Sequence, residues 1–543
     1  MNHQRIKSTY FSPQQLVGYC FLVCLVIPSA MIALKSFNMR PFHSNNTHIL
    51  WAIGAGIFGA LFVYMSRNQL LKIDQQTWRT QQKKTKIIGQ RFSKTHPLLN
   101  KIPIVGFLYK KWDAEPFLYK LALVLLCVLA AAIYLYDLTY YAWLPDEPLV
   151  ISAAKGYLET GTYTKWSFWM DQIGTEEYPR AWMHSWMVAQ SFRFFGVSEW
   201  SARIVSVILG LVFVPTIYGV AYFFLRNRPA ALTLTLVCIL HPYFIVYFRR
   251  TRMYALWLPV FSLLIYFSYQ SLTKRKTYNW AVYKNNPLVS KYLNYNWSWV
   301  ISTLLLLYFT VEVHKLSLVL LPALFLFFFY LLVLKKQIRL LPILFIGFVL
   351  FFWFSNRYGI LENIQKRFTF FEVYKPDYVK HLFLSPFQPT LSISILSVGL
   401  LCIWWTKHNA RLILVYLLLS MTIVLFTFSI DYSPNNNFRY VMHVIPFSCL
   451  LVIGVLFKIN QLFASKYLRW VLPITIILLS IGNFKYHHIW IYKVYPEAQF
   501  TQRAYPTILQ NIIPEKEGII ALYLQEAYMQ GWGKKVEYVR DRK

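Results

Sequence analysis

The stretch SARIVSVILGLVFVPTIYGVAYFFLRNRP, residues 201–229, decides the class of fold. Its apolar part is long enough to cross a hydrocarbon layer of about 30 Å, because a helix rises about 1.5 Å per residue. The run ends on Arg226 and Arg228, the charge expected at a cytoplasmic helix end. The same pattern recurs along a chain that is 57% hydrophobic and only 14% charged. The sequence therefore predicts an all-α polytopic membrane protein.

About thirteen spans follow from the apolar runs. The net charge of +33 supports their parity, since cytoplasmic loops collect Lys and Arg. Basic loops at 226–228, 274–291, 335–339, 407–411 and 458–469 all fall on the cytoplasmic side of this topology. The predicted spans lie near residues 16–36, 48–65, 117–136, 201–224, 230–248, 254–272, 298–313, 316–334, 340–354, 390–406, 412–430, 441–457 and 470–484.

Four regions are expected along the chain. Residues 1–65 form an additional N-terminal transmembrane hairpin, and 66–116 form a basic cytoplasmic loop with eleven Lys or Arg against three acids. Residues 117–484 form the main transmembrane core, with a first outer loop at 137–200, and 485–543 form a small extracytoplasmic region. The basic loop suits anionic membrane lipid, and nucleic acid is not an expected partner. It is also too short for a nucleotide-sugar domain, and no Asp-x-Asp occurs in the chain.

The first outer loop carries eight acids against four basic residues, and it begins with Asp146 and Glu147 between two prolines. The segments PLVISAAKGYLETG and PRAWMHSWMVAQSFRFFG each start with Pro and end with Gly, which is typical of short helices. We expect two amphipathic helices on the membrane surface. On local sequence, the two acids fit helix capping and catalysis equally well.

The segment YFRRTRMYAL breaks the charge rule. It places Arg249, Arg250 and Arg252 on the outer side, with no acid beside them in the sequence. Cations in such a position are costly, which favours an anionic ligand for them. The alternative is that this hairpin is misread and the arginines face the cytoplasm.

These residues resemble a known family. The run YPRAWMHSWMVAQSFRFFGVSEWSARIVSVILG, residues 178–210, resembles the PMT-like and aminoarabinose-transferase-like glycosyltransferases of the GT-C superfamily. The earlier Asp-Glu pair is similar to their first-loop acidic motif, RRTRMYAL to their Arg-x-Tyr element, and TVEVHKLSL to a segment that carries a His. The resemblance covers residues 121–334. One departure is that this chain reads EEYPRA where those enzymes have a Glu-Lys-Pro-like element.

The resemblance implies a GT-C-like bundle with inverting glycosyltransferase activity. Such an enzyme moves a sugar from a polyprenyl-phosphate-linked donor to an extracytoplasmic hydroxyl on a protein, a glycolipid or a cell-wall glycan. It would be a multi-pass protein of the cell inner (plasma) membrane, with its active site facing outside. On matching positions, the resemblance implies Asp146 as the catalytic carboxylate, Glu147 as its motif partner, and Arg180 and Arg252 as donor-phosphate ligands with Tyr254 beside them. It also implies that His314, with Glu177, takes the position of a divalent metal ligand or of an acceptor contact.

Two further arginines join the candidates on the charge argument. Arg249 belongs to the outer arginine group, and Arg439 begins a later span at its outer end. Guanidinium groups suit phosphate because they offer paired, permanently charged donors. Simpler readings remain open: Arg439 as an interfacial snorkelling residue, His314 as an interfacial histidine, Glu177 as a solvated loop acid and His184 as a polar position on a surface helix.

Two other functions stay open from the sequence. A lipid or sugar transporter or flippase would use ionisable sites near the midplane and often internal repeats, whereas the charged candidates here gather at the outer side. A scaffold with a decayed site would bind without turnover.

Overall fold

The computed structural model describes residues 116–136, 138–139, 147–167, 172–274, 295–334, 341–359, 410–427 and 442–460, with a few isolated positions elsewhere. The predicted spans at 16–36 and 390–406 lie outside the described residues, as do most of 48–65 and 470–484. The basic loop at 66–116 and the region 485–543 also lie outside them.

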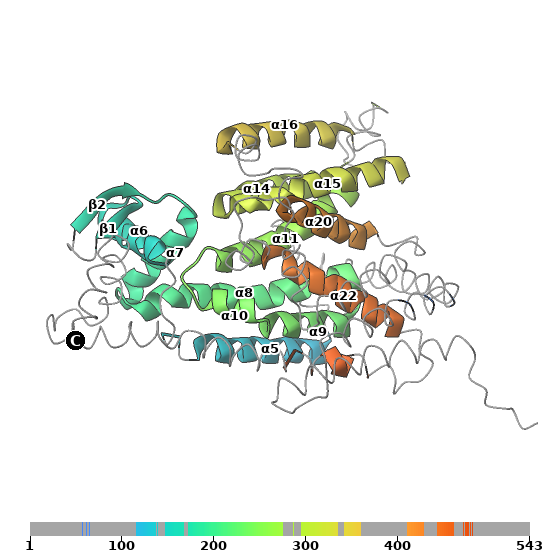
Figure 1. Ribbon diagram of the computed structural model, residues 1–543, viewed down its shortest axis with the longest axis horizontal. Helices are drawn as coiled ribbons and strands as arrows, with labels where there is room; N and C mark the ends of the chain where they lie inside the picture. Colours follow the sequence, from blue (N-terminus) through green and yellow to red (C-terminus); the bar gives the residue numbers. More distant parts are fainter. Residues whose placement is uncertain are drawn as a thin grey trace, which may run out of the picture.

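The described chain forms a bundle of roughly parallel helices with a small α/β group at one end (Figure 1). Five of its helical segments are long and apolar enough to cross a membrane, or six if one bent pair counts as a single span. The predicted class, a mostly helical polytopic membrane protein, is confirmed for this part. Its helices are α5 (Phe117–Leu135), α8 (Glu199–Leu225), α9 (Arg228–Ile239), α10 (Pro242–Phe248), α11 (Tyr254–Thr273), α14 (Trp297–Val313), α15 (Leu320–Phe329), α16 (Leu341–Tyr358), α20 (Ala410–Thr427) and α22 (Ile445–Asn460).

One predicted span is wrong as drawn. The run at 230–248 is two helices, α9 and α10, bent by 63° at their junction. Pro242 begins α10, and proline disfavours helical backbone at the residue before it. The His241 ring instead caps the new helix, because its Nδ1 accepts from the Tyr243 backbone N–H at 3.3 Å. The bend sets the direction in which the chain enters the arginine-rich turn.

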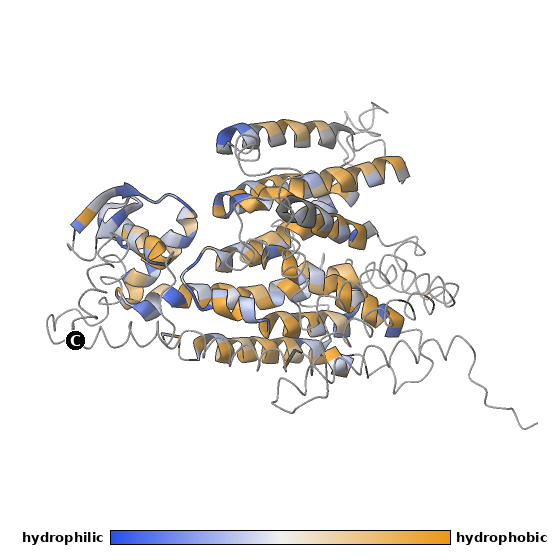
Figure 2. Cartoon of the chain, viewed as in Figure 1, coloured by the Kyte–Doolittle hydropathy of each residue, from blue (hydrophilic) through white to orange (hydrophobic). Residues whose placement is uncertain are grey.

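Close helix contacts hold the bundle together. Between helices in lipid, packing and small residues matter more than hydrophobic burial, since lipid is itself apolar. Gly210 of α8 lies against Phe248 of α10, and a Cβ there would come within 2.7 Å of the ring. Hydropathy colouring shows apolar residues along the helices and hydrophilic ones gathered toward the small α/β group (Figure 2). The absence of a side chain at Gly210 therefore lets α10 pack closely against α8.

The first outer loop contains helix α6 (Glu147–Thr160) and helix α7 (Trp182–Phe195), each followed by a glycine with left-handed backbone. The φ angles of Gly161 and Gly196 are 75° and 76°, a conformation that favours glycine at helix ends. The expected start of the second helix at Pro179 is wrong. The chain first makes a turn in which Ala181 has a φ of 51°, so α7 begins only at Trp182.

A β-hairpin between these helices was not expected from the sequence. Strand β1 (Thr164–Ser167) pairs antiparallel with β2 (Gln172–Glu177), with Trp166 opposite Ile173. The Ser152 hydroxyl of α6 donates to the Trp166 carbonyl at 2.7 Å, which fixes the hairpin on α6. The two helices and the hairpin make up one end of the molecule, called here the loop end (Figure 1).

The opposite end, called here the basic end, brings distant loops together. Arg411 at the start of α20 donates from Nη1 to the Phe223 carbonyl, near the end of α8, at 3.1 Å. This contact places Arg411 and the end of α8 at the same end of the bundle.

Candidate active site

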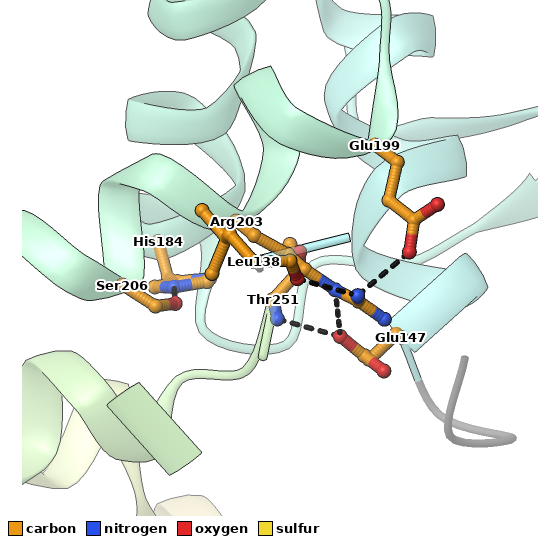
Figure 3. Close-up of polar contacts among 7 residues, drawn as sticks. All are labelled: Leu138, Glu147, His184, Glu199, Arg203, Ser206 and Thr251. Atoms are coloured by element: carbon orange, nitrogen blue, oxygen red, sulfur yellow. Dashed lines mark hydrogen bonds and ion pairs between the residues drawn. The ribbon is translucent and has the colours of Figure 1, made fainter. Parts of the chain in front are cut away.

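Glu147 begins α6 at the loop end and is fully buried. Its Oε1 accepts from the Thr251 backbone N–H at 2.8 Å and lies 3.6 Å from Nε of Arg203 (Figure 3). Removing a carboxylate from water is costly unless it is paired and hydrogen-bonded, and both conditions are met here. Glu147 thus ties the start of α6 to α8 and to the arginine-rich turn before α11.

Arg203 is a central residue of this network that the sequence reasoning did not assign. It is fully buried in the first turns of α8, with Nη1 2.6 Å from Oε1 of Glu199 and 3.0 Å from the Leu138 carbonyl that accepts from it (Figure 3). One guanidinium therefore holds two acids and the backbone that follows α5. Its local signal was Glu199, four residues earlier on the same helix face.

Two of the three arginines of YFRRTRMYAL lie inside the protein at the loop end. Arg249 is buried and donates to the Tyr136 carbonyl just after α5. Arg252 is also buried, with its guanidinium carbon 5.8 Å from the centre of the Tyr254 ring. Because Thr251 between them binds Glu147, the turn belongs to the loop end. The turn and Arg411 therefore lie at opposite ends of α8.

His184 of α7 is not a polar surface position, contrary to the simplest interpretation of the sequence. It is fully buried, and its Nε2 lies 3.4 Å from the Ser206 hydroxyl of α8 (Figure 3). Burial, and then the positive charge of Arg252, lowers the pKa of His184 to about 3. The ring is therefore neutral at ordinary pH, and a second positive charge beside Arg252 is avoided.

Tyr254 and His314 belong to an aromatic cluster centred on Trp257. The His314 ring stacks on Trp257 at 4.1 Å between centroids, and the His443 ring stacks on it at 4.3 Å. Tyr254 lies 5.4 Å from His314, and the Trp257 Nε1–H donates to Ser317 Oγ at 2.7 Å. His314 is thus packed in the protein rather than bound only to water. His443 was missed, because its contact with Trp257 joins distant parts of the chain.

The other candidates are not gathered with this network by any described contact. Arg180 and Glu177 are exposed, at the turn before α7 and at the end of β2. Asp146 and Arg439 lie outside the described residues, although Asp146 directly precedes the buried Glu147. Among the described residues, no group of three or more His, Cys, Asp or Glu could hold a metal ion.

The network concentrates buried positive charge at the loop end. Charges removed from water interact more strongly, because less solvent screens them. Contacts with Tyr136 and Tyr254 fix the two buried arginines in place. Glu147 holds their turn in place, and its carboxylate is engaged by the Thr251 N–H and by Arg203.

Comparison with known proteins agrees with the resemblance seen in the sequence. Residues 179–284 match the family model described as dolichyl-phosphate-mannose-protein mannosyltransferase. The PMT-like resemblance is therefore confirmed over a segment that contains Arg203, Arg249 and Arg252. No curated protein matches the chain significantly.

Two solved structures match the chain with TM-scores below 0.5. The first is ArnT from Cupriavidus metallidurans bound to undecaprenyl phosphate, with 14% identity and a TM-score of 0.47, covering 75% of this chain and 84% of that one. The second is apo ArnT from the same organism, with 13% identity and a TM-score of 0.41, covering 68% and 75%.

Proposed function

We propose that this chain is a membrane glycosyltransferase of the GT-C type. It moves a sugar from a polyprenyl-phosphate-linked donor to a hydroxyl of an extracytoplasmic acceptor, on a protein, a glycolipid or a cell-wall glycan. The observation that carries this proposal is the pair of buried arginines, Arg249 and Arg252, in a turn that Glu147 holds through Thr251. Both lie within the segment that matches the mannosyltransferase family.

In the proposed reaction, Asp146 is the general base. It takes the proton of the acceptor hydroxyl while that oxygen attacks the anomeric carbon. The bond from that carbon to the phosphate oxygen breaks, and the phosphate leaves with the electron pair. Attack from the side opposite the phosphate inverts the configuration. General base catalysis contributes about 10² to 10⁴ in rate.

The arginines stabilise the departing phosphate. Arg249 and Arg252 are in place at the loop end, and Arg180, Arg439 and Tyr254 are proposed to complete the donor site. Glu147 is proposed to act as a positioning residue: its contacts fix the first residue of α6, and so the backbone on which Asp146 lies. Arg203 supports it by neutralising its charge.

The described part of the chain gathers no group of three or more His, Cys, Asp or Glu for the metal ion that the resemblance implies. Nδ1 of His314 accepts from the Leu316 backbone N–H at 3.3 Å, so this ring nitrogen is already engaged. No step of the proposed reaction passes through a metal, and Glu177 and His314 are proposed as acceptor-side residues instead.

The proposed site faces away from the basic loops. Those loops mark the cytoplasmic side by the positive-inside rule, so the loop end lies outside the cell's inner (plasma) membrane. α6 and α7 are proposed to lie at the outer membrane surface, where lipid donor and acceptor can both reach the site.

The decisive experiment is transfer by purified protein in liposomes that contain polyprenyl-phosphate-linked sugars. Asp146→Asn is expected to lower the transfer rate about 10² to 10⁴ fold, because the base is lost while folding is kept. Glu159→Gln, near the end of α6, is the control and should keep full activity. Full transfer by Asp146→Asn would refute the assignment. Movement of lipid across the bilayer without transfer would favour a flippase.

The anomeric configuration of the product tests the inverting course. Inversion is expected, and a product with retained configuration would exclude a single direct attack. Mass spectrometry of envelope glycans and lipids from cells that lack the gene would identify the missing sugar and its acceptor.

A further inference from the structure

The basic end contains a second group of cations, far from the proposed donor site. It is defined here as the basic-end cluster: Arg226, which follows α8, Lys274, which follows α11, and Arg411, in the first turn of α20. Three helices that are distant in sequence thus end or begin at one place with a positive charge.

The two arginines of the cluster share a single aromatic ring. The guanidinium carbon of Arg226 lies 5.2 Å from the centre of the Phe223 ring, and that of Arg411 lies 4.8 Å from it. Arg411 is also fixed by its bond to the Phe223 carbonyl. Stacking on a ring offsets only part of the cost of holding like charges together.

The environment of the cluster lowers the pKa of one of its arginines. Burial, and then the like charge of Arg411, lowers the pKa of Arg226 to about 10. Arg226 therefore stays charged at neutral pH, beside the other two cations of the cluster.

Acids are missing where they would be expected. The loops at 226–228, 274–291, 335–339, 407–411 and 458–469 contain no Asp or Glu. Within the described part of the chain, no ion pair joins Arg226, Lys274 or Arg411 to a carboxylate. The loop end differs, since Arg203 there is paired with both Glu147 and Glu199.

We propose that the basic-end cluster binds the phosphate of an anionic membrane lipid. Two guanidinium groups and an ammonium group match phosphate oxygens in charge and in donor geometry. Pockets between helix ends on the cytoplasmic side are placed level with lipid headgroups. Arg226 and Arg411 are half-buried and Lys274 is exposed, so the cluster is open at its edge. This site is independent of the glycosyl-transfer site.

The test compares thermal unfolding in nanodiscs of phosphatidylcholine alone and with phosphatidylglycerol. Phosphatidylglycerol should raise the Tm of the wild type, because its phosphate relieves the repulsion. Arg411→Gln should lose most of that increase, yet should be at least as stable as the wild type in phosphatidylcholine, since one like charge is gone. Lys458→Gln, a cation of α22 outside the cluster, is the matched control and should keep the increase.

Three results would change the conclusion. Equal loss of Tm by Arg411→Gln in both lipids would make the arginine purely structural and overturn the proposal. An unchanged phosphatidylglycerol effect in Arg411→Gln would also overturn it. If inorganic phosphate in phosphatidylcholine nanodiscs gives the full increase, the phosphate site stands and the lipid source is wrong. Because the readout is stability, failure here leaves the Asp146 experiment unaffected.

Discussion

The two ends of this bundle use arginine in opposite ways. At the loop end, Arg203 lies between two acids, and the acid Glu147 also binds the turn that carries Arg249 and Arg252. At the basic end, Arg226 and Arg411 meet at one phenyl ring, and no described carboxylate pairs with them. An arginine paired with acids is held in a fixed geometry. Arginines close to each other without an acid repel, and a bound anion can lower the free energy of that repulsion. We therefore expect a rigid site at the loop end and a site that responds to lipid at the basic end.

Breaking the loop-end network should have the largest effect on stability. Glu147→Gln leaves the buried Arg203 without its second acid, and we expect a loss of about 3–5 kcal/mol in the free energy of unfolding. Thermal or denaturant unfolding in detergent measures it. The double variant Glu147→Gln with Arg203→Met should recover part of the loss, because no fully buried charge remains and Glu199, which loses its partner, is partly exposed. A Glu147→Gln variant as stable as the wild type would contradict this prediction.

A smaller effect is expected where α8 meets α10. Gly210→Ala adds a methyl group within 2.7 Å of the Phe248 ring, so we expect a loss of about 1–3 kcal/mol in the free energy of unfolding. Gly219→Ala, further along the same helix toward the basic end, meets no atom within 4 Å and should be neutral or slightly stabilising. Equal effects of the two variants on the free energy of unfolding would contradict a special role for the close contact between Gly210 and Phe248.

The smallest effect concerns pH and His184. The folded state keeps this ring neutral down to a pKa of about 3, while the unfolded chain takes up a proton below about pH 6.5. The free energy of unfolding should therefore fall as the pH drops below about 6.5, because the unfolded state then binds up to one proton more than the folded state. His184→Gln should remove that slope between about pH 6.5 and 5, a window above the titration of ordinary carboxylates. An unchanged slope would assign it to another group.

Much of the fold was visible in the sequence. Apolar length and basic loops predicted the helices, and Gly161 and Gly196 predicted the ends of α6 and α7. The break between α9 and α10 was also signalled, by a proline within an apolar run, but the length of the run outweighed it. Such local patterns predict helix ends correctly, because backbone geometry depends on residues close by in the sequence.

The site was less predictable, because its contacts join distant parts of the chain. The sequence indicated Glu147 as a helix cap or as the motif partner of Asp146, yet it binds Thr251, 104 residues away. Arg203 was assigned no role from the sequence, because its ion pair with Glu147 forms only in the folded structure. The stacking of His443 on Trp257 depends on how α11 and the start of α22 meet. Such pairs are decided by tertiary packing, which no local pattern reports.

The network at the loop end also bears on the order of synthesis. Arg249 and the Thr251 amide bind partners made 113 and 104 residues earlier, and chains grow at roughly 5–20 residues per second. The acceptors are therefore complete for several seconds before the three arginines leave the ribosome. An arginine costs about 2.5–3.5 kcal/mol to place in the centre of a membrane helix during insertion. Partners that are already in position would reduce the cost of inserting the arginine-rich segment. The order of synthesis would therefore help this segment to reach its folded position.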